Sequence, residues 1–356
     1  MKKRLVLVLV VALLITAFGG CKSTSNSADD NKSQTDSKQS GNLVIYTARD
    51  QKVSDEVVKM FNAKYPDIKV DVLTMGAQQI IERVRSEKAN PGADFWWGGT
   101  KSQFMQAANE GLLESYKPSF DSAIKTEAKD SQNRWYGEML LPEVIMYNSQ
   151  ALTPETAPQD WDDLLDPKWK DKIIIRGVLP SGTMRTIFSA MIYNQDPKSP
   201  EKGYDWLRKL DANTKEYAQD PTNLYLKLTR QEGTVSVWDL QDVLLQKYAS
   251  NQPLDYIYPK SGAPILVDGV GIVKGAKNIE NAKLFYEFLF SPETVQKLAK
   301  DFYQIPSRTD VDTSKMPDWY KNIGFKEMQL DWKVMADNET NWMKYWDENI
   351  KGKNKK

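Results

Sequence analysis

Residues 173–193 read Ile-Ile-Ile-Arg-Gly-Val-Leu-Pro-Ser-Gly-Thr-Met-Arg-Thr-Ile-Phe-Ser-Ala-Met-Ile-Tyr, and this stretch decides the predicted fold. The β-branched residues 173–175 predict a strand that is buried on both faces. Pro180 and Gly182 then end the extended segment, and apolar side chains recur at helical spacing over residues 184–192. The stretch therefore predicts a strand, a turn of small residues and a helix.

The turn in this stretch is a candidate anion-binding site. Ser181 and Thr183 stand where the N-cap and the first exposed amides of the helix should be. A helix N-terminus presents unpaired N–H groups and about half a positive charge, and Gly182 leaves room for a ligand to approach the backbone. Arg185 adds a guanidinium group that can pair with phosphate. A capped surface helix without a ligand explains the same residues, so the rest of the chain must decide.

The composition excludes several classes of chemistry. The chain has 356 residues, 40% of them hydrophobic, which suffices for two domains of moderate size. Cys21 is the only cysteine and histidine is absent, which excludes Cys/His nucleophiles, histidine bases and the usual zinc ligand sets. We expect no catalytic residue, no resident metal and no cofactor.

The charge balance bears on the partner. Lys2, Lys3 and Arg4 belong to the first segment, and the remainder carries 45 basic and 48 acidic side chains, a net charge of −3. A nucleic acid is therefore not an expected partner.

Residues 1–20 are predicted to be a secretory signal peptide. A basic start precedes an apolar run over residues 5–18 that is too short for a comfortable transmembrane helix. The segment resembles a bacterial lipoprotein signal, with Phe18 in place of the usual small residue, and this resemblance implies that Cys21 is lipidated. Residues 21–40 are polar and predict a disordered tether. An uncleaved membrane anchor is the alternative; both interpretations place the folded part outside the cytoplasm.

The folded part is predicted to form two α/β lobes. Strand and helix patterns alternate from residue 43 to residue 110, which is typical of a mostly parallel sheet covered by helices. Because ligands sit beyond the carboxyl ends of such strands, Thr47, Gly99 and Thr100 are candidate ligand contacts. Residues 135–148 form a long apolar extended segment that we interpret as a crossing between the lobes.

The expected domains follow from this crossing. Residues 41–145 and 265–356 are predicted to form lobe 1, and residues 146–264 to form lobe 2. Residues 257–259 and 265–273 are predicted to be strands that return to lobe 1, and Asp268 is expected either to line the cleft or to fix the crossing. Trp238 and Asp239 end a predicted strand, where an aromatic face and a carboxylate could hold a sugar ring. A core tryptophan beside a surface aspartate is the alternative.

The order of these parts resembles the extracellular solute-binding proteins of bacterial ABC importers, in the group that includes ferric-ion, phosphonate, thiamine and sugar-phosphate binders. The matching segments are residues 43–47, 93–99, 146–148, 180–183 and 268–278. The resemblance implies a two-lobed periplasmic-binding-protein fold (type II), with ligand held in the cleft. It also implies that Ser181, Gly182 and Thr183 contact phosphate or carbonate through amides and hydroxyls, and that Asn223 adds a polar contact.

We therefore expect a lipid-anchored, monomeric receptor that captures a small anionic solute, such as an organophosphate, and delivers it to a membrane permease. A ferric-ion receptor is the alternative within the same family. Ferric-ion binders usually carry two tandem tyrosines after the strand that matches residues 235–238, whereas this chain has Asp239 and Leu240 there. A secreted carboxylate-based hydrolase is a less favoured alternative, because no convincing pair of acidic residues stands out.

Overall fold

The computed structural model describes residues 39–321 and 323–353. The predicted signal peptide, the lipidation of Cys21 and all but the end of the predicted tether fall outside the described residues. Within the described ranges, no helix combines the length and the apolar character needed to cross a membrane.

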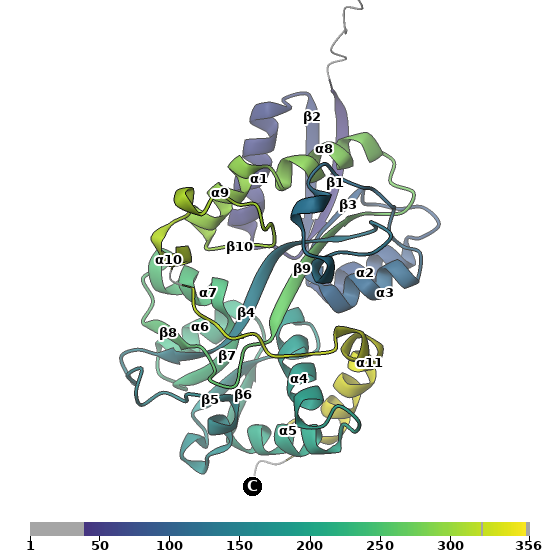
Figure 1. The fold of residues 1–356 in the computed structure, drawn as a ribbon. Coiled ribbons are helices and arrows are strands. Elements are labelled where there is room, and N and C mark those ends of the chain that lie inside the picture. The colour runs from purple at the N-terminus through teal and green to yellow at the C-terminus, as the bar shows by residue number, and fades with distance from the viewer. Residues whose placement is uncertain (1–38, 322, 354–356) are drawn as a thin grey trace, which may run out of the picture. The chain divides into compact units, whose positions relative to one another are not determined.

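The first lobe is built from parallel strands with helices on both faces (Figure 1). Strand β1 pairs in parallel with both β2 and β3, and β3 continues the sheet toward the crossing strands. The predicted alternation of strands and helices up to residue 110 is confirmed. The elements are β1 (Gly41–Thr47), α1 (Gln51–Lys64), β2 (Ile68–Thr74), α2 (Ala77–Ser86), β3 (Phe95–Thr100), α3 (Lys101–Asn109), α8 (Ile279–Leu289) and α9 (Pro292–Phe302).

Two long strands connect the lobes. Strand β4 (Tyr136–Asn148) pairs antiparallel with β9 (Ile265–Ile272) over residues 136–142 and with β7 over residues 143–147. The predicted crossing is therefore confirmed, and a single strand belongs to both halves of the sheet, whose order is β2-β1-β3-β9-β4-β7-β5-β6. The outer strands are parallel, and the crossing strands are antiparallel to their neighbours.

The second lobe contains residues 173–193, the stretch that decides the predicted fold. Residues 173–175 form a strand that is fully buried on both faces, and the helix after it begins at Gly182, as predicted. This helix is buried on nearly all sides because α5, α11 and strand β7 pack around it. The elements are β5 (Ile173–Arg176), α4 (Gly182–Gln195), α5 (Glu201–Asn213), β6 (Thr214–Ala218), α6 (Pro221–Thr229), β7 (Val235–Asp239), α7 (Leu240–Leu244) and β8 (Leu254–Ile257).

The prediction that residues 257–259 return to the first lobe is wrong. Strand β8 ends at Ile257 and pairs with residues 145–148 of β4, which lie in the second lobe. Pro259, which has no N–H to donate to a ladder, follows the end of this strand. The return is made by β9 alone.

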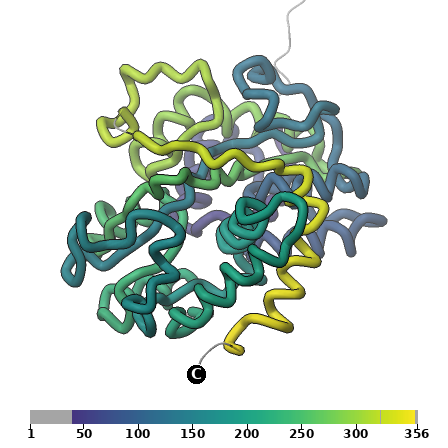
Figure 2. Tube along the Cα trace, turned by 60° about the horizontal axis from the view of Figure 1, so that its bottom comes forward, coloured from purple at the N-terminus to yellow at the C-terminus, as the bar shows by residue number. Residues whose placement is uncertain are grey.

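The C-terminal helix packs with the second lobe, whereas the sequence predicted that it belongs to the first. After β10 (Ile305–Pro306) and α10 (Asp318–Lys321), helix α11 (Trp332–Asn349) packs against both α3 and α4. Both views show this yellow helix alongside the teal α4 (Figures 1 and 2). Trp342, Met343 and Trp346 join the hydrophobic cluster of the second lobe, although residues 265–356 were assigned to the first. Short 3₁₀ turns lie at 121–123, 126–128, 161–165, 167–169 and 313–315, and a π-turn at 245–249.

Candidate ligand-binding cavity

A cavity of about 760 Å³ lies where the two hydrophobic clusters meet. Its walls come from both lobes and from the crossing strands β4 and β9. The residues that line it are Ala48, Arg49, Asp50, Val53, Thr74, Met75, Gly76, Ala77, Gly99, Thr100, Met139, Leu141, Arg176, Pro180, Ser181, Gly182, Thr183, Pro221, Thr222, Tyr225, Leu226, Trp238, Asp239, Gln241, Asp242, Leu245, Gln246, Gln252, Leu266 and Asp268.

Five helices of nine or more residues begin at this cavity, beside the short helix α7. In each, the N-cap or the first helical residue lines the cavity wall, because the helices follow strands whose carboxyl ends meet there. The helices are α1 at Asp50, α2 at Gly76, α3 at Thr100, α4 at Ser181 and α6 at Pro221. Each helix N-terminus carries about half a positive charge, so the cavity favours a negatively charged group near these N-termini.

The turn before α4 offers free backbone donors. The Ser181 hydroxyl accepts a hydrogen bond from the Met184 amide at 3.2 Å, which caps the helix as the sequence predicts. Within the described part of the chain, the amides of Gly182 and Thr183 have no hydrogen-bond partner. A methyl group on Gly182 would lie 2.8 Å from the Thr100 methyl carbon, so the two lobes approach closely at this point. An alanine at position 182 would therefore force Thr100 or the turn to shift.

Seven of the ten predicted contact residues line this cavity. They are Gly99, Thr100, Ser181, Gly182, Thr183, Trp238 and Asp239. Two of them have their amides already occupied: Gly99 donates to Asp268 at 2.6 Å, and Thr100 donates to the Gln103 side chain at 2.9 Å. Whether the seven bind a ligand stays a prediction.

Three predicted contact residues do not line the cavity. Thr47 is fully buried, and its hydroxyl accepts a hydrogen bond from the Arg49 amide. Arg185 points toward α11, where its guanidinium pairs with Glu339 at 2.5 Å. The Asn223 amide group donates to Asp220 at 2.6 Å and so stabilises the start of α6. The sequence did not predict the partners that hold these three side chains.

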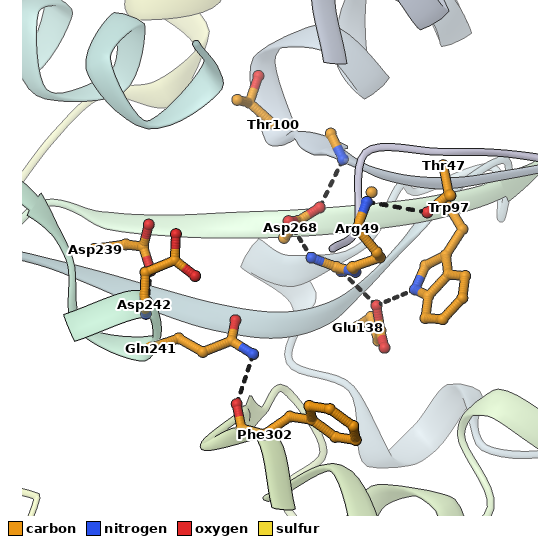
Figure 3. A network of polar contacts seen from close by, with 12 residues as sticks. Thr47, Arg49, Trp97, Thr100, Glu138, Asp239, Gln241, Asp242, Asp268 and Phe302 are labelled. Carbon is orange, nitrogen blue, oxygen red and sulfur yellow. Dashed lines mark hydrogen bonds and ion pairs between the residues drawn. The ribbon is translucent and has the colours of Figure 1, made fainter. Parts of the chain in front are cut away.

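A buried ion-pair network joins the first lobe to the crossing strands (Figure 3). The Arg49 guanidinium lies 2.5 Å from Glu138 of β4 and 2.6 Å from Asp268 of β9. The Trp97 indole also donates to Glu138, at 2.7 Å. Burial raises the pKa of Glu138, and Arg49 opposes that rise. Asp268 therefore has both of its expected roles, since it lines the cavity and anchors the crossing.

Arg176 is a cationic cavity residue that the sequence analysis missed. It is the last residue of β5, and one of its terminal nitrogens donates to the Gly177 carbonyl. Its Nε atom is buried without a partner, and no ion pair engages it within the described residues. Its position was available from the sequence, because it directly follows the buried strand at residues 173–175, where ligands are expected to bind.

The floor of the cavity is acidic. Asp239 ends β7 and is the N-cap of α7, Asp242 lies in the first turn of α7, and Figure 3 shows their carboxyl groups next to each other. Burial, together with the neighbouring Asp242 carboxyl, holds the pKa of Asp239 well above its usual range. Burial also raises the pKa of Asp242, which accepts hydrogen bonds from Tyr225 and Trp238. Trp238 thus packs as a buried tryptophan whose ring nitrogen is satisfied by a carboxylate.

The described residues contain no group of three or more His, Cys, Asp and Glu side chains that could hold a metal ion. Tyr225 is the one tyrosine in the cavity wall, and its hydroxyl is engaged by Asp242.

Two α/β lobes, crossing strands and a cavity between them define a periplasmic-binding-protein fold. The chain belongs to the bacterial extracellular solute-binding proteins, because the model of that family matches residues 92–328. It is similar to an uncharacterised protein of Haemophilus influenzae, with 30% identity over 77% of this chain and 80% of that protein. It is also similar to a putative 2-aminoethylphosphonate-binding periplasmic protein of Salmonella typhimurium, with 29% identity over 70% of this chain and 73% of that one.

A solved structure agrees with this fold. The periplasmic binding protein AfuA from Actinobacillus pleuropneumoniae, with fructose-6-phosphate bound, is 29% identical and covers 88% of this chain and 100% of its own, with a TM-score of 0.77. The protein is therefore a periplasmic or extracellular solute-binding protein of the kind that serves ABC transporters. This family is non-enzymatic, which removes the hydrolase alternative.

Proposed function

We propose that this protein captures a small anionic solute carrying a phosphate or phosphonate group, and delivers it to the permease of an ABC importer. The observation that carries the proposal is the convergence of five helix N-termini, from both lobes, on one cavity. Aligned backbone dipoles stabilise a negative charge in that cavity without any need for a metal ion.

The oxyanion is placed at the turn before α4. The free amides of Gly182 and Thr183 donate to it, and the hydroxyls of Ser181 and Thr183 add further donors. Arg176, whose Nε has no partner, supplies a charged donor at the same edge of the sheet. Hydrogen bonds to a charged group contribute about 1.5–3 kcal/mol each when water is excluded.

Apolar side chains support these polar contacts. Met139 and Leu141 of β4, Leu266 of β9 and Trp238 of β7 line the same cavity. They exclude water from the oxyanion and leave room for the remainder of the solute, which is the usual composition of a small-molecule site. The relatives named for a sugar phosphate and for an aminoethylphosphonate both take ligands with a tetrahedral oxyanion, which supports the same class here.

The proposal extends to the N-terminal segment. Cys21 is the lipidated first residue of the mature protein, and residues 21–40 tether a monomeric receptor to the outer face of the membrane. Expression of Cys21→Ala should release the protein into the culture medium, and mass spectrometry of the wild-type N-terminus should find an acylated cysteine. A free, unmodified N-terminus at another residue would contradict the anchor.

The ligand class can be tested with purified residues 39–356. Thermal denaturation should shift upward with glucose-6-phosphate or 2-aminoethylphosphonate but not with glucose. Replacement of the proposed donors, in Arg176→Met and Thr183→Val, should each reduce affinity about tenfold, which corresponds to about 1.4 kcal/mol. Asn349→Ala is the matched control, since Asn349 lies exposed on α11 and does not line the cavity, and it should bind as the wild type does. An equal response to glucose and its phosphate would contradict an anion site.

A further inference from the structure

We propose that Gln241 and Tyr248 of the second lobe form a clasp with Phe302 and Tyr303 of the first, and that this clasp holds the lobes in the arrangement in which the cavity binds its solute. Gln241 is then a positioning residue. The clasp lies where α7 and the π-turn after it meet the end of α9. Its effect on solute affinity rests on the proposed function, whereas its effect on the arrangement of the lobes does not.

The first contact of the clasp is a hydrogen bond from one lobe to the other. The Gln241 side-chain amide donates to the Phe302 carbonyl at 2.7 Å, as Figure 3 shows. Phe302 is the last residue of α9, and the last four carbonyls of a helix have no partner within that helix. Gln241 therefore caps a helix of the first lobe from a helix of the second. Because its side chain is buried, water competes little for this bond.

The chain turns sharply at Tyr303, directly after this carbonyl. Tyr303 has a φ of 55°, a left-handed conformation that residues other than glycine rarely adopt. The side chains of two successive residues go to different lobes, since Phe302 packs against the hydrophobic cluster of the first lobe and Tyr303 against that of the second. A strained backbone conformation persists only where its surroundings hold it. The end of α9 is thus shaped to contact both lobes.

A stacked pair of tyrosines is the second contact of the clasp. The rings of Tyr248 and Tyr303 lie with their centroids 5.8 Å apart and their planes at 25°. Tyr248 is 56% exposed, so the two rings can separate without opening a hydrophobic core. The clasp therefore consists of one buried hydrogen bond and one exposed stack, and such a contact can form and break as two lobes move.

The segment that carries the clasp also forms part of the cavity wall. Gln241 lines the cavity beside Asp239 and Asp242, which stand at the start of α7. A displacement of α7 relative to α9 therefore changes the shape of the cavity, and a solute that fills the cavity restricts the movement of Gln241. Solute binding and clasp formation then strengthen each other by the same factor, because coupling between two binding equilibria is reciprocal.

The arrangement of the lobes is tested by the distance between two spin labels in the absence of solute. Cys21 is the only native cysteine, so the full chain with Cys21→Ala takes labels only at introduced cysteines. Lys59→Cys on α1 and Lys202→Cys on α5 place one label on each lobe, at side chains that are 78% and 71% exposed. We expect Gln241→Met and Tyr248→Ala each to shift and broaden the distance distribution measured by pulsed electron paramagnetic resonance.

The effect on the cavity is tested by titration calorimetry with glucose-6-phosphate. Gln241→Met and Tyr248→Ala should each bind this probe about tenfold more weakly than the wild type, a factor within the usual range of coupling between two sites. Gln150→Met is the matched control, because Gln150 is exposed in the turn after β4 and does not line the cavity. It should keep both the distance distribution and the affinity of the wild type. Urea unfolding of each variant separates a changed arrangement of the lobes from a lost fold.

The results separate the clasp from other roles of the same residues. An unchanged distance distribution in both variants would overturn the clasp, and weaker binding by Gln241→Met alone would then make Gln241 a direct contact of the solute. A changed distribution in a protein whose wild type does not bind glucose-6-phosphate would support the clasp and count against the proposed function.

Discussion

Removal of the Arg49 guanidinium should destabilise the protein far more than removal of an exposed arginine. Arg49→Met keeps most of the side-chain volume but leaves Glu138 and Asp268 without their cation. All three side chains are nearly inaccessible, with exposures of 6%, 5% and 11% for Arg49, Glu138 and Asp268. Loss of one partner from a buried ion pair costs about 3–5 kcal/mol, because the remaining charge is uncompensated. We expect a loss of this size in the free energy of unfolding.

The measurement is equilibrium unfolding in urea, followed by tryptophan fluorescence and by circular dichroism. Arg85→Met is the matched control, because Arg85 pairs with Glu110 at 2.6 Å but is 40% exposed. An exposed pair contributes at most about 1 kcal/mol, so the control should lose little. The double variant Arg49→Met with Glu138→Gln should recover part of the loss, because it also removes one of the stranded charges.

The pH dependence gives a second check on the cause. Burial raises the pKa of Glu138 in the folded protein, and loss of Arg49 removes the main opposing influence. A carboxyl group with a higher pKa in the folded state binds more protons there, so stability falls as the pH rises through that range. The deficit of Arg49→Met should therefore shrink as the pH is lowered from neutral toward 5. A loss below about 1 kcal/mol, or a deficit that is the same at every pH, would refute the reasoning.

Three further substitutions test other parts of the structure. Gly182→Ala places a carbon 2.8 Å from the methyl group across the cavity, so affinity for glucose-6-phosphate should fall about tenfold, whereas Gly177→Ala, with its nearest neighbour at 3.4 Å, should bind normally. Burial holds the pKa of Glu143 well above its usual range, so the free energy of unfolding of the wild type should fall as the pH rises above neutral and this carboxyl ionises. Glu143→Gln should show a smaller fall; identical dependence in the two proteins from pH 6 to 9 would contradict that role. Arg185→Met leaves Glu339 buried and unpaired, so urea unfolding should detect a loss of about 3–5 kcal/mol, while a changed ligand affinity with intact stability would return Arg185 to the binding site.

Local patterns in the sequence were sufficient for the elements that position the cavity. The β-branched run at residues 173–175, the breakers at Pro180 and Gly182, and the capping serine at 181 each act over a few residues, and the strand, turn and helix follow from them. The apolar segment at residues 135–148 was equally informative, because its length and the absence of helical spacing left only an extended crossing. The carboxyl ends of the strands then indicated where the cavity lies.

Long-range pairing is what the sequence could not supply. Arg49 and Asp268 are separated by 219 positions, and Arg185 and Glu339 by 154, so no local pattern joins either pair. Arg185 was placed in the site because it follows the anion-binding turn, yet a carboxylate on a helix near the C-terminus holds it. Arg176 differs from these pairs, because its place directly after the buried strand was visible in the sequence.

Helix α11 has a consequence for the order in which the chain can fold. The hydrophobic cluster of the second lobe is completed by Trp342, Met343 and Trp346, and the cluster of the first lobe requires β9 and α8. Neither half of the protein is therefore complete when its first residues emerge during synthesis. A nascent chain shorter than about 350 residues exposes the apolar surface that α11 covers in the folded protein. Chaperones and the export machinery therefore meet a polypeptide that cannot bury this surface until α11 has been synthesised.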